Sequence, residues 1–374
     1  MSATSEKSGG ISFSQVNKHF ESFHAVRDLD LAIDEGELLV LLGPSGCGKT
    51  TTLNMLAGLE QPSSGELRFG EQLMNNVPPE ERDIAMVFQS IALYPHLNVR
   101  ENIGFSLRNS RVAKTEIAAR VAEVAGILEI ETYLERKITQ LSGGQRQRVA
   151  IAKALVRRPR LFLLDEPFSS LDAELRRQMR GEIVRIHREV ETTMVFVTHD
   201  QEEAMAIADR IAVMNGGRLM QLGQPLDLYQ APTTMWIAKF IGAHPINILD
   251  STLTNGRSGA SLLPENRWNV QLPESIRSGI AGKATNDHVY IGIRPEHMLL
   301  SSAGSGSDNP TAGEIYTRQI LGTEILYEVK VGDALLRAVV PTSQVFSVGD
   351  AVRLGIDWTN ALMFDHESEQ TILS

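Results

Sequence analysis

Two glycine-rich stretches of this 374-residue chain contain the residue types that bind phosphate. The first is "GPSGCGKT" at residues 43–50. The second is "LSGGQRQRVA" at residues 141–150, where a serine and two glycines precede a helix-like run. Backbone N–H groups at the start of a helix are free to bind an anion, and the helix dipole favours negative charge there. We therefore expect two anion sites in one chain, and the second needs its own explanation.

The first stretch predicts a P-loop for a nucleoside triphosphate. It fits the pattern G-x-x-x-x-G-K-[ST], with the strand-like run "ELLVLL" before it and the helix-like run "TTLNMLAGL" after it. Its glycines let the backbone wrap around phosphates, Lys49 adds positive charge toward the β- and γ-phosphates, and the Thr50 hydroxyl can hold Mg²⁺. The expected ATP-binding residues here are Gly43, Pro44, Ser45, Gly46, Cys47, Gly48, Lys49, Thr50 and Thr51.

Two adjacent carboxylates follow another apolar run, in "LFLLDEP". Neighbouring side chains on an extended segment point to opposite sides. Asp165 can therefore serve the Mg²⁺ of the P-loop, while Glu166 faces the attacking water as a general base. Without the P-loop, the same two residues would indicate an ordinary turn at the end of a strand.

Two further polar residues follow apolar runs. His199 ends "TMVFVTH", and ligands of α/β proteins bind where parallel strands end, so we expect its imidazole to contact the γ-phosphate. A single histidine outside such a setting is more often structural. Gln89 in "MVFQ" follows a short apolar run, and its amide could reach Mg²⁺ or the attacking water. Taken alone, this glutamine carries little information.

Composition limits the classes of protein that fit. The chain has 46 acidic and 36 basic residues, a net charge of −10, which argues against nucleic acid as a partner. Its single cysteine, Cys47, has no partner for a disulfide within the chain. No apolar run approaches the roughly 18 residues needed to span a bilayer. The sequence therefore predicts that other chains hold this protein at any membrane where it acts.

The order of elements predicts two domains. Up to about residue 230, continuous apolar runs at 37–43, 160–166 and 193–199 alternate with helical segments, as in a parallel sheet that is buried on both faces. Beyond residue 236, strand-like pieces such as "HVYIGI", "EILYEVKV", "ALLRAVV" and "AVRLGIDW" are separated by turns, which favours a small all-β domain. We expect an α/β nucleotide-binding domain at 11–235 and an all-β domain at 236–374.

The motifs together resemble the ATP-binding cassette (ABC) ATPases. "GPSGCGKTT", "FQ", "LSGGQ", "LLDEP", "SLD" and "TH" occur in the order and approximate spacing of that family. "PPEERDIAMVFQSIALYPHLNVRENI", "FIGAHPIN" and "GIRPEHM" are similar to the carbohydrate-importer branch, which includes the maltose and glycerol-3-phosphate importer ATPases. The resemblance extends over about residues 11–365 and is looser in the β domain.

The resemblance implies a reason for the second anion site. In this family two cassettes face each other head to tail. Each ATP lies between the P-loop of one cassette and the "LSGGQ" stretch of the other, which is called the signature. Ser142, Gly143, Gly144 and Gln145 would then contact the γ-phosphate held by Lys49 of a second copy or of a homologous ATPase. By the same resemblance Phe20 stacks on adenine, Asp172 communicates across the dimer, and Gln89 joins Mg²⁺ sensing to the membrane subunits.

The implied protein is the ATP-hydrolysing subunit of an importer for a sugar, a polyol or glycerol phosphate. Its fold would be a P-loop domain with a helical subdomain, followed by an OB-like regulatory domain. Glu166 would activate water while His199 and Lys49 stabilise the charge on the γ-phosphate. The expected partners are two transmembrane permease subunits and an extracytoplasmic solute-binding protein, with the chain peripheral to the cytoplasmic side of the cell membrane.

Other classes share part of this pattern. Importers of polyamine, ferric iron or sulfate have the same two-domain plan. Soluble ABC ATPases that work on DNA or ribosomes usually carry paired cassettes or a long coiled-coil insertion, and neither occurs here. A P-loop GTPase would need an N-K-x-D motif, which the chain lacks, and a P-loop kinase would leave "LSGGQ" unexplained. The transported substrate and the choice between homodimer and heterodimer stay open.

Overall fold

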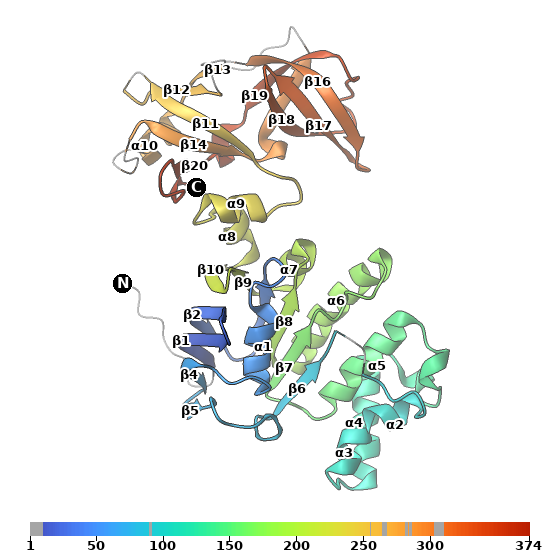
Figure 1. Cartoon of the computed structure of the whole chain (residues 1–374). Helices are drawn as coiled ribbons and strands as arrows, with labels where there is room; N and C mark the ends of the chain where they lie inside the picture. The colour runs from blue at the N-terminus through green and yellow to red at the C-terminus, as the bar shows by residue number, and fades with distance from the viewer. Residues whose placement is uncertain are drawn as a thin grey trace. The chain divides into compact units, whose positions relative to one another are not determined.

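The computed structural model describes residues 10–89, 92–254, 256–263, 268–280, 283, 286–302 and 310–374. Its contacts divide the chain into two compact units, Met1–Pro225 and Leu226–Ser374 (Figure 1). The sequence places the domain boundary at 235/236, whereas the compact units meet at 225/226.

The first unit is organised around a six-stranded sheet in the order β10-β9-β3-β8-β7-β6. Strands β3 and β8 are buried along their whole length, and all of their residues are apolar except the two threonines that begin and end β8. Such strands suit a sheet covered on both faces. The strands are β3 (Leu38–Leu42), β6 (Ile84–Val87), β7 (Leu161–Asp165), β8 (Thr193–Thr198), β9 (Arg210–Asn215) and β10 (Arg218–Gly223).

The direction of these strands decides where the chemistry gathers. Strands β6, β7, β8 and β3 run parallel as successive neighbours, with Leu163 opposite Val195 and Val195 opposite Leu39. Their carboxyl ends therefore lie along one edge of the sheet. The P-loop follows β3, Gln89 follows β6, and His199 follows β8, so the parallel order places the expected site at that edge.

A second, antiparallel sheet has the order β2-β1-β4-β5. One hydrophobic core joins it to the central sheet, because Phe13 from β1, Leu53 from helix α1 and Leu41 from β3 belong to the same buried cluster. Helix α1 thereby fixes the P-loop between two sheets. The elements are β1 (Ile11–Phe20), β2 (Phe23–Ile33), β4 (Ser64–Phe69), β5 (Gln72–Leu73) and α1 (Lys49–Ala57).

Helices α2 to α5 lie beyond β6, at the lower right of Figure 1. Helix α5 buries Val149, Ile151 and Leu155, and it contacts both α2 and β6. These apolar contacts attach the helical part to the edge of the sheet. The helices of this unit are α2 (Val99–Ile103), α3 (Phe105–Asn109), α4 (Lys114–Ile127), α5 (Gly143–Leu155), α6 (Ala173–Val190) and α7 (Gln201–Ile207).

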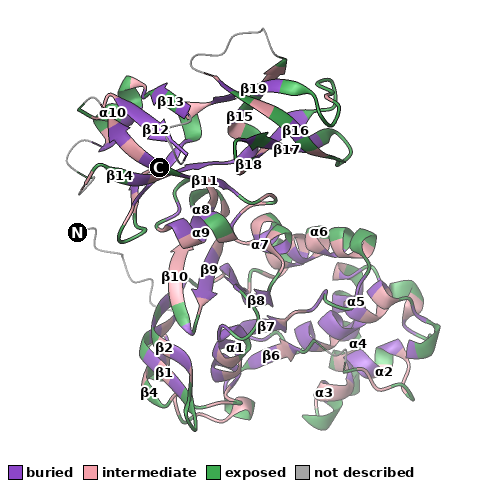
Figure 2. Cartoon of the chain, turned by 45° about the horizontal axis from the view of Figure 1, so that its top comes forward, coloured by how far each residue is buried: buried purple, intermediate pink, exposed green. Residues whose placement is uncertain are grey.

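The second unit is built mainly from two antiparallel sheets, in the orders β13-β12-β11-β14-β20-β21 and β15-β19-β16-β17-β18. Residues from both sheets, among them Leu249, Ile291, Tyr327 and Leu354, form one buried cluster. Figure 2 shows these strands with buried residues in purple. The all-β character expected from the sequence is confirmed, and in the described residues three short helices accompany the sheets.

The elements of the second unit have the following bounds. The helices are α8 (Pro225–Gln230), α9 (Met235–Phe240) and α10 (Glu274–Ile280). The first sheet contains β11 (Asn247–Thr254), β12 (Gly259–Leu262), β13 (Trp268–Gln271), β14 (His288–Ile293), β20 (Leu362–Asp365) and β21 (Thr371–Leu373). The second contains β15 (Met298–Ser302), β16 (Thr311–Ile320), β17 (Glu324–Val331), β18 (Ala334–Pro341) and β19 (Ala351–Ile356).

Arg294 ties helices α8 and α9 to the strands of the second unit. Its guanidinium donates to the Ile241 carbonyl at 2.7 Å and to the Tyr229 carbonyl at 2.6 Å, and it lies over the Tyr229 ring. Burial lowers the pKa of Arg294 to about 10. The side chain is buried because these carbonyls and the ring replace water around its charge. Among the described residues, no helix has the length and apolar character required to cross a bilayer.

Candidate nucleotide and catalytic site

The loop between β3 and α1 brings its backbone against neighbouring backbone. Gly48 has φ +104°, and a Cβ atom there would lie 2.6 Å from the Ala25 carbonyl oxygen. A Cβ atom at Gly43 would lie 2.2 Å from the Met214 carbonyl oxygen. Only glycine fits at these two positions, so the loop keeps the shape that exposes its N–H groups at the start of α1.

Lys49 lies within the curve of this loop. Its buried Nζ atom donates to the Gly43 carbonyl at 2.7 Å and to the Pro44 carbonyl at 2.9 Å. The positive charge therefore lies within the loop, against two of its carbonyl oxygens. Burial raises the pKa of the neighbouring Cys47 thiol, and the Lys49 charge opposes that effect.

Thr50 and Asp165 approach each other from α1 and β7. The Thr50 hydroxyl donates to Asp165 Oδ1 at 3.4 Å. Burial raises the pKa of Asp165, and the adjacent Glu166 charge raises it further. A hydroxyl and a carboxylate oxygen with a buried negative charge fit the ligand preferences of Mg²⁺, which binds proteins through one or two carboxylates plus substrate phosphates. Among the described residues, no group of three or more His, Cys, Asp and Glu side chains could hold a metal by itself.

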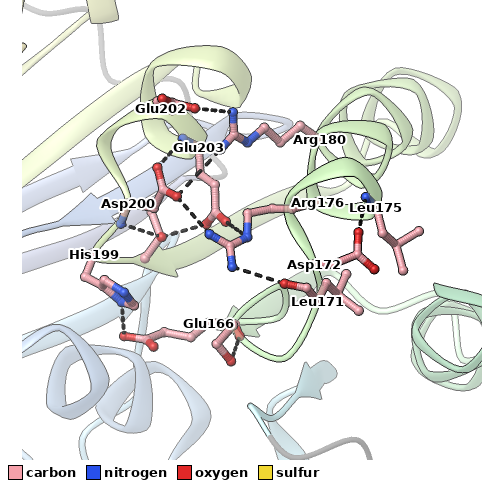
Figure 3. A network of polar contacts seen from close by, with 12 residues as sticks. Glu166, Leu171, Asp172, Leu175, Arg176, Arg180, His199, Asp200, Glu202 and Glu203 are labelled. Carbon is pink, nitrogen blue, oxygen red and sulfur yellow. Dashed lines mark hydrogen bonds and ion pairs between the residues drawn. The ribbon is translucent and has the colours of Figure 1, made fainter. Parts of the chain in front are cut away.

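Glu166 has polar partners on two sides, His199 and Gln89, and Figure 3 shows the first of them. His199 Nδ1 lies 3.1 Å from Glu166 Oε1, and Gln89 Nε2 donates to Glu166 Oε2 at 3.5 Å. Glu166 has φ +42°, an uncommon value for a residue with a side chain, while its N–H donates to the Val197 carbonyl at 3.0 Å. The structure thus brings together the carboxylate, the imidazole and the amide that the sequence singled out separately.

An open cleft of about 540 Å³ adjoins these groups. It is lined by Phe88, Gln89, Asp165, Ser169 and Ser170. Its position beside the Thr50–Asp165 pair leaves space for phosphate and water next to Glu166. The aromatic residue expected at the adenine, Phe20, ends β1 with 40% of its surface exposed, and Lys18 Nζ lies 4.7 Å from its ring centroid.

The second glycine-rich stretch begins helix α5. The Ser142 hydroxyl accepts from the Gln145 N–H at 3.3 Å, and Gln145 Oε1 accepts from the Ser142 N–H at 2.9 Å, which forms a capping box. Gly144 packs so closely on Leu175 that a Cβ atom would lie 2.6 Å from its Cδ1 atom. The Gln145 side chain therefore has a structural task in addition to any contact with phosphate.

The two anion sites of one chain stand apart. In Figures 1 and 2, α1 lies among β3 and its neighbours, whereas α5 lies beyond β6 and β7. Asp172, expected to communicate across a dimer, is the N-cap of α6, and its Oδ1 accepts from the Leu175 N–H at 2.9 Å. Helix α5, which begins after Ser142, does not lie against α1 in either view.

Sequence reasoning missed a polar network behind the Glu166–His199 pair. Arg176 and Arg180 on α6 contact acidic residues at the start of α7, chiefly Asp200 and Glu203 (Figure 3). Asp200 directly follows His199 in the sequence, and this adjacency could have indicated that Asp200 helps to position the histidine. The pairing of α6 with α7 was not visible, because it depends on tertiary packing.

Comparison with known proteins identifies the family of this chain. Residues 26–169 match the family described as ABC transporter, and residues 291–364 match the TOBE domain. The chain is 42% identical to the sulfoquinovosyl glycerol transport ATP-binding protein SmoE of Agrobacterium fabrum, over 97% of this chain and 99% of SmoE. It is 50% identical to the sn-glycerol-3-phosphate import ATP-binding protein UgpC of Rhizobium meliloti, over 76% of each chain.

Solved structures give the same class. The dimeric post-hydrolysis structure of the ATP-binding cassette MJ0796, bound to ADP and Pi, superimposes with a TM-score of 0.51 and 32% identity. The match covers 57% of this chain and 98% of that one. The chain belongs to the ABC transporter family, as one of its ATP-binding, ATP-hydrolysing subunits. The family resemblance and the fold class expected from the sequence are confirmed.

Proposed function

We propose that this chain powers the uptake of a sugar, a polyol or glycerol phosphate across the cell membrane. The observation that carries the proposal is the position of Glu166 between His199 and Gln89, beside the Thr50–Asp165 pair and the P-loop. The substrate class is supported by the relatives, which are named for transport of sulfoquinovosyl glycerol and of sn-glycerol 3-phosphate.

In the proposed reaction, Glu166 accepts a proton from the attacking water. The water oxygen bonds to the γ-phosphorus as the bond to the ADP oxygen breaks, which yields ADP and phosphate. His199 orients Glu166 through Oε1 and, with Lys49, stabilises the charge on the phosphate oxygens. Thr50, Asp165 and Gln89 would hold Mg²⁺, whose positive charge offsets that of the β- and γ-phosphates.

We also propose that each ATP lies between two copies of this chain, or between it and a homologous ATPase. Residues 43–51 and Phe20 would bind ATP from one side. Ser142, Gly143, Gly144 and Gln145 of the second copy would contact its γ-phosphate, because the start of α5 presents N–H groups and a favourable dipole. Separation of α1 from α5 within one chain supports this arrangement, as does the dimeric cassette MJ0796.

A groove beside β6 and α5 supports the proposal that this chain binds a membrane subunit. It has a volume of about 480 Å³ and an apolar lining that includes Leu59, Met86 and Phe88, with Lys153 at its side. The buried Ser106 hydroxyl in this groove makes no hydrogen bond to any residue that the structure describes. We propose that a cytoplasmic helix of one permease subunit docks in this groove and holds the chain at the membrane. The second permease subunit would dock in the same way on the second ATPase chain.

The surface expected for this contact begins just after Gln89, with "SIALYPHLNV" at residues 90–99, and Ser90 and Ile91 lie outside the described residues. In the proposed transporter the permease subunits receive solute from an extracytoplasmic solute-binding protein. Nucleic acid has no part in this function.

The catalytic assignment is tested with Glu166→Gln. We expect ATP binding to persist while hydrolysis falls by about 10²- to 10⁴-fold, the usual contribution of a general base. Loss of one negative charge near the γ-phosphate should also let an ATP-bound dimer accumulate, as measured by gel filtration. Glu189→Gln is the matched control, because Glu189 makes only an exposed ion pair with Arg185 on α6. Near-normal turnover of Glu166→Gln would contradict the assignment.

The substrate class is tested in cells that carry the chain with its permeases and binding protein. Uptake of labelled maltose, sugar alcohols and glycerol 3-phosphate is compared with uptake of spermidine, sulfate and ferric iron. Uptake of one member of the first group, abolished by Glu166→Gln, is expected. ATP-dependent uptake confined to the second group would overturn the substrate class and leave the ATPase assignment intact.

A further inference from the structure

His199 lies between two residues that are both held by α7. The Thr198 hydroxyl donates to Glu203 Oε2 at 2.7 Å and accepts from the Asp200 N–H at 2.9 Å. Asp200 is the N-cap of α7, and its Oδ1 accepts from the Glu203 N–H at 3.1 Å. The backbone on each side of His199 is thus fixed by Asp200 and Glu203, so a movement of these two side chains moves the imidazole.

Arg176 connects this segment to the loop that ends at Asp172. Its Nη1 donates to Asp200 Oδ2 at 3.3 Å, and its Nη2 donates to the Leu171 carbonyl at 3.2 Å (Figure 3). The Arg176 N–H also donates to the Asp172 carbonyl at 2.9 Å. One guanidinium therefore joins the residue before Asp172 to the residue after His199.

Arg180, one turn further along α6, provides a natural comparison. Its Nη2 lies 3.6 Å from Asp200 Oδ2, and its Nη1 donates to Glu202 Oε2 at 3.2 Å. Both arginines place a positive charge beside Asp200. Of the two, Arg176 donates a hydrogen bond to the Leu171 carbonyl. A comparison of the two arginines therefore distinguishes the effect of positive charge beside Asp200 from the effect of the link to the Leu171–Asp172 loop.

The network has room to change its geometry. A small cavity of about 60 Å³ lies among Glu166, Ser169, Arg176, Thr198, His199, Asp200 and Glu203. The buried Arg176 Nε makes no hydrogen bond to any described residue and lies 3.6 Å from Glu203 Oε1. A small shift of the Asp172 loop would close that distance and carry Asp200 with it.

We infer that Arg176 is a positioning residue for hydrolysis, which sets the His199 ring against Glu166 according to the position of the Leu171–Asp172 loop. The inference rests on the proposed catalytic roles of Glu166 and His199. The planar guanidinium suits this task, because its donors lie in a fixed fork, whereas a lysine ammonium holds charge without a fixed direction. Displacement of a catalytic group by about 1 Å costs on the order of 100-fold in rate.

The test compares Arg176→Lys with Arg180→Lys in the full chain. Both variants keep a positive charge near Asp200, but only Arg176→Lys loses the fork that reaches the Leu171 carbonyl. We expect Arg176→Lys to lower kcat for ATP hydrolysis by about 10- to 100-fold with little change in KM, and Arg180→Lys to change kcat by about twofold at most. Equal loss in the two variants would overturn the inference, because charge alone would then explain it.

A second comparison asks whether Arg176 acts through His199. In a His199→Ala background, single-turnover hydrolysis should show no further loss on Arg176→Lys, since residues that act as a unit are not additive. A loss as large as in the wild-type chain would overturn the inference. If His199→Ala itself keeps wild-type turnover, the proposed catalytic role of His199 is wrong. If His199→Ala loses turnover but Arg176→Lys keeps it, the role of His199 stands and the inference about Arg176 is wrong.

A spectroscopic readout keeps the test decisive if the residual rates are too low. The imidazole signals of ¹⁵N-histidine protein are recorded, and the His199 signal is identified by its loss in His199→Ala. We expect Arg176→Lys to shift this signal and Arg180→Lys to leave it in place, with thermal midpoints measured for both. If Arg176→Lys does not fold, Glu203→Gln replaces it, since Glu203 holds Thr198. An unmoved His199 signal would overturn the inference.

Discussion

Asp165 and Glu166 are adjacent carboxylates, and their neighbours give them different chemistry. Asp165 faces the Thr50 hydroxyl, and its pKa is raised by burial and by the adjacent Glu166 charge. Glu166 faces the imidazole of His199 and the amide of Gln89, which hold it beside the open cleft. Either carboxylate could hold a cation or accept a proton from water. The neighbouring side chains support the proposed assignment of the first role to Asp165 and of the second to Glu166.

Cys47 offers a probe of the loop at the same scale. Burial raises the pKa of its thiol, so the reactive thiolate is scarcer at pH 7 to 8 than in a free cysteine. We expect iodoacetamide to label the folded chain at least about 10-fold more slowly than a small thiol, with the rate increasing as pH rises above 9. The same raised pKa means that the stability due to the neutral thiol is present below pH 9 and lost as pH rises through the folded pKa.

Mass spectrometry of the alkylated protein gives this rate directly, because the chain has a single cysteine. Unfolded protein in guanidinium chloride is the control and should react at the rate of the small thiol. Bound ATP should slow labelling further by covering the loop. Rapid labelling of the folded chain at pH 7 would contradict the burial of Cys47.

At the scale of elements, the start of α5 combines two tasks in few residues. Ser142 caps the helix through the reciprocal hydrogen bonds with Gln145, and the same N-terminus is the proposed site for the γ-phosphate of a second copy. Gly144 packs against the Leu175 side chain on α6, so a larger residue there would displace that side chain. The stability of α5 and the proposed phosphate binding therefore depend on overlapping atoms. A substitution that keeps the helix cap but repels phosphate can distinguish the two.

Two substitutions at Ser142 make this separation. Ser142→Asp keeps an N-cap acceptor and places a negative charge at the positive end of α5, so stability should match the wild-type chain. The same charge repels phosphate, so ATP-driven dimer formation in a Glu166→Gln background should be lost. Ser142→Ala should cost about 1 kcal/mol of stability through loss of the cap, with weaker but detectable dimer formation.

Denaturant unfolding and gel filtration with ATP give the two quantities for each Ser142 variant. Asn98, which caps α2 with its own capping box, supplies a control position, since Asn98→Ala should cost similar stability without abolishing dimer formation. Normal dimer formation by Ser142→Asp would remove the start of α5 from the proposed ATP site.

At the scale of the whole molecule, the proposed arrangement has one chain present half of each of two ATP sites. The P-loop and the signature are both complete in their local geometry, yet α1 and α5 stand apart in the same unit. A lesion in either half should therefore damage a site that a second chain shares. Mixed dimers test this directly, because they combine the lesions of two variants in a defined way.

The two variants are Lys49→Ala and Ser142→Arg. Each homodimer has two damaged sites. In a mixed dimer, one site gathers both lesions and the other pairs an intact Lys49 with an intact Ser142. We expect ATP-dependent cross-linking across the dimer to recover in part in the mixture, and in neither variant alone, since only mixed dimers have an intact site and each of them has one of two. No recovery, with mixed dimers shown to form, would mean that both motifs serve the nucleotide of one chain.

Much of this protein follows from short stretches of sequence. The P-loop, the apolar strands and the carboxylates at 165–166 are recognisable because each depends on residues close together in the chain. Glycine is required where the backbone passes within contact distance of another carbonyl, and a strand buried on both faces needs a continuous apolar run. Ser142 and Gln145 likewise have the spacing of a capping box, which is a local interaction.

Tertiary structure decided which of these pieces meet. The order β6-β7-β8-β3 brings Gln89, Glu166 and His199 to one edge, and no local pattern states which strands are neighbours. The contact of Arg176 with Asp200 depends on how α6 packs beside α7, since 24 positions separate the two residues. The sequence places residues 226–235 in the first domain, but the Arg294 guanidinium holds Tyr229 of this segment to the strands of the second unit through its backbone carbonyl, which carries no sequence signal.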